Sequence, residues 1–110
     1  MTLRGLEPAI RDQAECAFKI ANSYGMKPVV TSTRRAWAEQ QRLRERWERG
    51  ESEFPANKPG DSAHQYGLAF DSWVPDDQMA CWVDIRRSVG LRVPEGDLIH
   101  AERPEWRSSI

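Results

Sequence analysis

Apolar residues recur with helical spacing in three segments of the chain. The predicted helices span 7–24, 37–49 and 77–89. The first has the clearest period, with apolar residues three or four positions apart: Ile10, Ala14, Ala17 and Ala21. Gly25 and Gly90 follow the first and third helices, where glycine is a natural terminator. The second helix is heavily charged, and its expected inward side chains are Trp37, Leu43 and Trp47.

Short runs of β-branched and apolar residues predict the strands. These runs lie at 28–32, 66–73, 91–93 and 98–102. Residues 50–62 hold prolines and glycines without a periodic pattern, which predicts a loop long enough to be functional. This mixture of helices and strands favours one α+β domain over residues 1–110, a small antiparallel sheet with helices packed on it.

Composition narrows the range of partners. The chain is 39% hydrophobic and 30% charged, which is typical of a globular protein, and its net charge of −1 argues against a nucleic-acid partner. It has no apolar run long enough for membrane insertion, and its first residues lack the apolar core of a signal peptide. We therefore expect synthesis in the cytoplasm without a signal peptide, and a monomer.

The chain has only two histidines, and each lies in a segment that looks like half of a metal site. The first segment is SAHQYGLAFD at 62–71, which contains His64 and Asp71. Side chains alternate along a strand, so two residues seven apart would point to opposite faces. Both can reach one metal only if His64 lies before the strand or if the chain is irregular near Gly67.

The second segment is DLIHAE at 97–102, which contains His100. Two imidazoles and a carboxylate are suitable protein ligands for a catalytic zinc ion, which keeps a fourth position for water. Asp97 could then accept a proton from that water, with Glu95 and Glu102 as rival carboxylates. Glu102 shares the parity of His100 and could instead hold its second ring nitrogen. A half-buried histidine bonded to a backbone carbonyl is the alternative interpretation.

Two arginines follow the first predicted strand, at the edge of the sheet where that strand ends. Arg34 and Arg35 stand where the helix dipole does not favour a cation, which hints at another use. An arginine there can clamp a carboxylate or stabilise an oxyanion. The pattern alone does not choose between the two.

Together, three segments resemble the zinc peptidases of peptidoglycan: the D-Ala-D-Ala carboxypeptidases of the VanY type and the L-Ala-D-Glu endopeptidases of phage endolysins. The family pattern is S-G-Y-R-S-x-x-E-Q, then P-G-x-S-x-H-x-x-G-x-A-x-D, then D-x-x-H-x-E. The matching stretches here are STRRAWAEQ at 32–40, PGDSAHQYGLAFD at 59–71 and DLIHAE at 97–102. The middle motif matches in full, and the resemblance covers roughly residues 28–103. The amino-terminal domain of hedgehog proteins looks like a relative of the same fold.

The resemblance implies a role for each matched residue. One Zn²⁺ ion would be bound by His64, Asp71 and His100. Asp97 would be the general base, and Arg35 would polarise the scissile carbonyl. The substrate-binding residues would be Ser62 and Gln40, with Glu102 supporting a ligand.

The resemblance also implies a peptidoglycan stem peptide as the substrate. The connection from Gly90 to Asp97 is shorter than in many relatives, which often have a Trp-Gly-Gly turn there. This shortness and the compact chain favour an endolysin-like L-Ala-D-Glu endopeptidase that reaches the cell wall after phage-type release. A D-Ala-D-Ala carboxypeptidase, a non-catalytic zinc-containing binding module and a metal-free structural protein remain alternatives.

Overall fold

The structure, a computed structural model, describes residues 2–53 and 55–110. Its helices are α1 (Pro8–Ser23), α2 (Trp37–Glu48) and α3 (Met79–Ser88), and its strands are β1 (Val29–Ser32), β2 (Ala69–Trp73) and β3 (His100–Glu102). Short 3-10 turns lie at Ala63–Tyr66, Asp76–Gln78 and Trp106–Ser109. The strands form an antiparallel sheet in the order β1-β2-β3. The predicted α+β class, with helices on a small antiparallel sheet, is confirmed.

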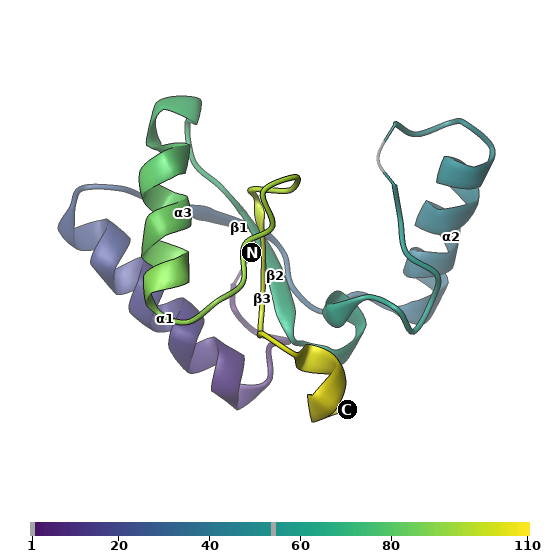
Figure 1. Ribbon diagram of the computed structural model, residues 1–110, viewed down its shortest axis with the longest axis horizontal. Coiled ribbons are helices and arrows are strands. Elements are labelled where there is room, and N and C mark those ends of the chain that lie inside the picture. Colours follow the sequence, from purple (N-terminus) through teal and green to yellow (C-terminus); the bar gives the residue numbers. More distant parts are fainter. Residues whose placement is uncertain (1, 54) are drawn as a thin grey trace.

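Helices α1 and α3 cover one face of the sheet (Figure 1). The four apolar residues predicted to face inward from α1 are all fully buried. At the centre of this layer, the ring of Phe18 packs edge-on against Trp82 and also contacts Phe70 of β2. Trp82 donates a hydrogen bond to Ser72 of β2 at 2.9 Å. Because side chains alternate along a strand, Asp71 points to the opposite face.

Three of the predicted strands are shorter than expected or absent. Residues 66–68 belong to the 3-10 turn and the bend after it, since Gly67 adopts a left-handed conformation that ends the turn. The prediction of a strand at 91–93 was wrong, because only Arg92 pairs, with Glu102 in a single bridge. Pro94 lacks the N–H that would extend this pairing. The strand predicted at 98–102 begins only at His100.

Helix α2 lies apart from α1 and α3 (Figure 1). The prediction of its inward residues was wrong for Trp37, which is 55% exposed, whereas Leu43 and Trp47 are half-buried and Gln40 is the only residue of α2 that is fully buried. A helix that does not pack on the sheet has no need of a continuous apolar stripe. Among the described residues, no helix is both long and apolar enough to cross a membrane.

Candidate metal and catalytic site

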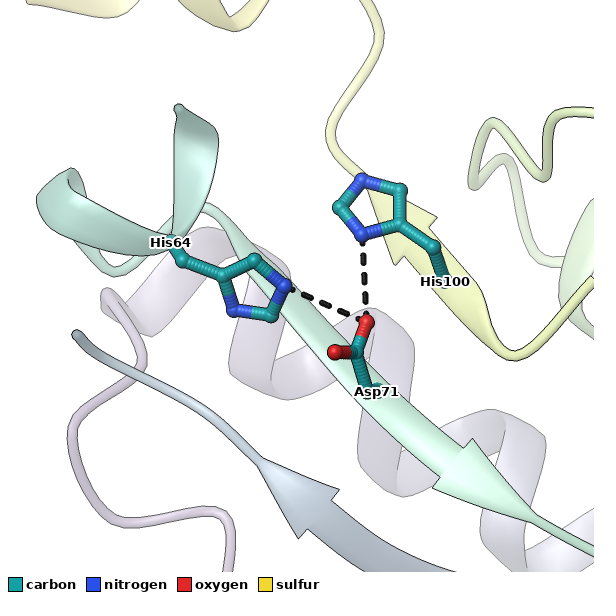
Figure 2. Close-up of side chains that lie close together, drawn as sticks. All are labelled: His64, Asp71 and His100. Carbon is teal, nitrogen blue, oxygen red and sulfur yellow. Dashed lines mark hydrogen bonds and ion pairs between the residues drawn. The ribbon is translucent and has the colours of Figure 1, made fainter. Parts of the chain in front are cut away.

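Three side chains from distant parts of the sequence converge on the face of the sheet opposite α1 and α3. His64, Asp71 and His100 offer ligand atoms that all lie within 4.8 Å of one another. Figure 2 shows both imidazoles pointing at the carboxylate, and each ring has a nitrogen 3.2 Å from Oδ1 of Asp71. Asp71 and His100 are direct cross-strand partners on β2 and β3. The predicted metal group is therefore assembled, and its donor set could hold one metal ion.

His64 reaches this group because it lies outside the strand. It belongs to the 3-10 turn Ala63–Tyr66, which is one of the two arrangements that the parity argument left open, and it is buried. Its Nδ1 lies 2.7 Å from the carbonyl oxygen of Thr33 and donates to it, so Nε2 is the nitrogen that faces Asp71 and could bind a metal. A carbonyl that fixes the ring tautomer in this way is typical of metal-binding histidines.

His100 is oriented by a carboxylate. Its Nε2 lies 2.7 Å from Oε1 of Glu102, and its Nδ1 faces Asp71. Glu102 is in turn held by Arg92, whose Nη1 is 3.1 Å from Oε2. Glu102 therefore stands where the sequence placed it, against the second ring nitrogen, and we expect it to orient His100.

The charges of this group stabilise one another. Burial alone would raise the pKa of Asp71, but hydrogen bonds from His100 and His64 outweigh it and hold that pKa well below its usual range. Burial opposes the charged form of His100, yet its hydrogen bonds to Asp71 and Glu102 raise the pKa of the ring to about 9. A dense anionic cluster that attracts a proton so strongly is also suited to a divalent cation.

Asp97 lies in the turn before β3, where its backbone carbonyl accepts a hydrogen bond from the amide of His100 at 3.1 Å. Its side chain lines the same cavity as the three candidate ligands and is exposed to solvent. Partial burial raises the pKa of Asp97, while the charges of His100, His64 and Arg86 act in the opposite direction. Glu95, the rival carboxylate, is not among the residues that line the cavity.

The two candidate arginines have separate environments. Arg35 lines the cavity, with Nη1 2.9 Å from Oε1 of Gln40 and Nη2 3.9 Å from Oδ2 of Asp71. Arg34 turns away from it, and its guanidinium bonds to the carbonyl oxygen of Gly5 and, at 2.8 Å, to Glu7. The geometry therefore brings Arg35, and not Arg34, to the candidate metal group.

The two candidate substrate-binding residues differ in their contacts. Gln40 is 1% exposed, and its amide is engaged at both ends, accepting from Arg35 and donating to the carbonyl oxygen of Asn57 at 2.7 Å. It ties Arg35 to the 50–62 loop rather than offering a free group. Ser62 immediately precedes the turn that carries His64 and lines the cavity.

The cavity has a volume of about 700 Å³ and runs from the candidate ligands to α2 and the 50–62 loop. Its far wall includes Leu43, Arg46, Glu51, Pro55 and Asn57. The loop was expected to be functional, but the wall residues themselves carry no sequence pattern. A second hollow of about 290 Å³ adjoins it and shares Asn57, Ser62, His100 and Glu102 as lining residues.

Comparison with known proteins identifies the class to which this fold and site belong. Residues 4–89 match the family model VanY, D-alanyl-D-alanine carboxypeptidase. The chain therefore belongs to the VanY family of peptidoglycan peptidases. The matched range includes His64 and Asp71 and ends before Asp97 and His100. A search of curated protein sequences gave no significant match.

Solved structures share the fold at low sequence identity. The VanY D,D-pentapeptidase of a VanB-type resistance cassette, crystallised with Zn(II), superimposes with a TM-score of 0.72 at 19% identity, covering 89% of this chain and 72% of that one. VanYB in complex with D-alanine-D-alanine gives 0.74 at 18% identity, covering 94% and 74%. The L-Ala D-Glu endopeptidase ChiX of Serratia marcescens gives 0.70 at 18% identity, covering 98% and 87%. VanY-type peptidases and an L-Ala D-Glu endopeptidase are thus similar in fold to this chain.

Proposed function

We propose that this protein is a zinc peptidase that hydrolyses one peptide bond in the stem peptide of peptidoglycan. The observation that carries the proposal is the convergence of His64, Asp71 and His100 in one cavity with Asp97 and Arg35. Family membership supplies the class of substrate. The zinc complex of a structural neighbour supports the choice of metal.

The donor set fits zinc. Two neutral imidazole nitrogens and one carboxylate oxygen are a common protein ligand set for a catalytic zinc ion, and the Thr33 carbonyl and Glu102 fix both rings from behind. When bound, zinc lowers the pKa of a coordinated water to about 7 and draws electron density from a carbonyl oxygen. The remaining steps depend on this chain's own side chains.

In this proposal, Asp97 takes a proton from the attacking water and later delivers it to the leaving amine. Its raised pKa brings it nearer to the range of a useful acid and base. Arg35 donates to the carbonyl oxygen as negative charge develops there. Gln40 holds the guanidinium of Arg35 in place through its 2.9 Å hydrogen bond.

For the bond that is cut, we favour the L-Ala-D-Glu bond. An endopeptidase needs a groove that continues on both sides of the metal, and two hollows meet at four shared residues, which include Ser62, His100 and Glu102. A carboxypeptidase needs a cation for the terminal carboxylate. Of the cations near the sequence motifs, Arg34 is bonded to Glu7 and Lys58 does not line the cavity.

D-Ala-D-Ala carboxypeptidase activity is the second candidate, favoured by the family model. On this alternative Arg46, a cation in the α2 wall of the cavity, is the residue available to bind the terminal carboxylate. The alternative therefore predicts that R46M raises KM for a stem peptide with a free D-Ala terminus and leaves kcat nearly unchanged. The endopeptidase proposal predicts no such dependence on the free terminus.

Mass spectrometry of digested peptidoglycan tests the proposal. Zinc-loaded protein is incubated with purified cell wall, with D97N as the matched inactive variant. New peptides with an N-terminal D-glutamyl residue support the endopeptidase. Free D-alanine with otherwise intact stems supports the carboxypeptidase, and no peptide or amino acid from the wild-type protein contradicts both. Equal product from wild type and D97N would instead remove Asp97 from the mechanism.

A further inference from the structure

Beneath the candidate site, on the side of α3, an arginine is completely buried. Arg86 has no exposed surface, although its side chain carries a positive charge. Its guanidinium lies 5.0 Å from the centre of the Trp82 ring, and its Nε donates to the carbonyl oxygen of Trp82. Arginine is rarely buried without a paired anion, because removing its charge from water is costly.

No carboxylate within the described residues forms an ion pair with Arg86, and its Nη1 has no hydrogen-bond partner. Burial lowers the pKa of Arg86 to about 10, so it remains a cation at neutral pH. The acidic groups whose charges act favourably on it are Asp71 and Asp97, across the layer in the candidate site. A group kept at this cost is expected to do something that an apolar side chain of the same size cannot do.

Arg86 holds the turn that carries Asp97 and His100. Its Nη2 donates to the carbonyl oxygen of Leu98 at 2.5 Å. Leu98 is the residue after Asp97 and lies two before His100. The same turn is closed by the His100 amide on the Asp97 carbonyl, at 3.1 Å, and by the Ser72 amide on the Ile99 carbonyl, at 3.0 Å. The side chains of Leu98 and Ile99 are 39% and 41% exposed, so packing alone does not hold this turn.

We propose that Arg86 is a positioning residue that fixes Asp97 over the metal group by its charge-assisted hydrogen bond to the Leu98 carbonyl. The inference rests on the proposed function, in which Asp97 is the base. A guanidinium suits the task because its planar fork can donate to Leu98 and Trp82 at once, and a donor that carries a full charge binds a carbonyl more strongly than a neutral one. The charge also faces Asp71 and Asp97, so the turn and its acidic side chain are attracted toward α3.

The chain offers a matched control in the next residue. Arg87 also donates from α3 to a backbone carbonyl of this connection, that of Val93 at 2.7 Å, but Val93 is four residues before Asp97. Both R86M and R87M therefore remove one arginine-to-carbonyl hydrogen bond between the same two segments. Only R86M removes the hydrogen bond to Leu98, the residue adjacent to Asp97.

The experiment measures kcat, KM, zinc affinity and amide hydrogen exchange for wild type, R86M, R86K and R87M. For R86M we expect kcat to fall by about 10²-fold with little change in KM, since a small displacement of a reacting group costs about this much. Zinc affinity falls by about tenfold or less, because the three ligand side chains remain. Exchange at the amides of His100 and Ser72, which close this turn, becomes faster. R87M keeps kcat and the exchange rates of those two amides near those of wild type.

R86K keeps the buried charge but not the fork, so an intermediate loss of roughly tenfold in kcat is expected. Wild-type kcat in folded R86M overturns the proposal, as does an equal loss in R86M and R87M. If R86M does not fold, R86K decides, and an unchanged kcat in R86K overturns the proposal. Exchange and zinc titration need no substrate, so a wild-type protein inactive on cell wall would contradict the proposed function while these two measurements still test Arg86.

Discussion

Among single residues, Asp97 has the most specific chemical task, and one substitution isolates it. D97N keeps the size and the backbone contacts of the side chain but cannot accept a proton. We expect kcat to fall by roughly 10²–10⁴-fold, the usual contribution of a general base. Zinc affinity should stay close to that of wild type, because Asp97 is not among the candidate ligands. Steady-state kinetics and metal titration measure the two quantities.

The control for D97N is E95Q, which removes a carboxylate two residues away that does not line the cavity. It should keep kcat within about twofold, since exposed substitutions away from a site rarely matter. Equal losses in D97N and E95Q would mean that the charge of the whole turn is important, and not a base at Asp97.

The neighbouring arginines make a second matched pair. R35M removes the cation that faces Asp71 and Gln40 in the cavity, so we expect about a 10²-fold loss of kcat, as for other donors to a developing oxyanion. R34M removes an exposed ion pair with Glu7 and a hydrogen bond to the carbonyl oxygen of Gly5, which costs about 1–2 kcal/mol of stability and leaves kcat unchanged. Kinetics on both variants, with thermal unfolding, checks the assignment. A larger kcat loss in R34M than in R35M would reverse it.

At the scale of elements, the sequence pattern predicted the features that depend mainly on residues close together in the sequence. The period of α1 predicted its four buried residues, and the parity of the 62–71 segment left two arrangements open, of which the structure shows His64 before the strand. The pattern failed where tertiary contacts decide: Pro94 and the turn at Asp97 shorten the last strands, and α2 does not bury Trp37. Cys16 and Cys81 lie on α1 and α3 and are exposed, although free cysteine is among the residue types most often buried. The Thr33 carbonyl behind His64 is a backbone group, which no sequence motif reveals.

Gly67 joins the turn of His64 to β2, and its conformation restricts which residue can stand there. Its φ is 70°, and a Cβ on it would lie 2.6 Å from the carbonyl oxygen of Gly5 and 2.5 Å from Nη2 of Arg34. G67A should therefore destabilise the fold by more than the roughly 1–3 kcal/mol of a left-handed non-glycine residue. G25A is its control, because Gly25 has φ 81° but a Cβ on it would meet no atom within 4 Å. Urea unfolding of both variants measures the difference, and equal losses would show that the contacts at Gly67 are unimportant.

For the whole molecule, the sheet separates the hydrophobic core on one face from the candidate site on the other. One face of β2 presents Phe70 and Ser72 to α1 and α3, and the other presents Asp71 to the cavity. The candidate ligands come from the 3-10 turn, β2 and β3, so a metal ion bound there would link segments far apart in sequence (Figure 1, Figure 2). The acidic and imidazole groups of this face therefore gain a shared partner only in the folded chain.

This arrangement predicts that zinc stabilises the whole fold. A ligand that binds only the native state stabilises it by mass action, by about 2.7 kcal/mol at one hundred times its dissociation constant. For a chain of this size that corresponds to a rise in Tm of roughly 10 °C. Scanning calorimetry with zinc, and with a chelator added afterwards, measures the shift and its reversal. H64A and H100A should each lose the shift, because two remaining donors bind zinc much more weakly than three. R92M, which removes only the support of Glu102, should keep most of it. A full zinc shift in either histidine variant would contradict the ligand set, whatever the activity of the wild-type protein.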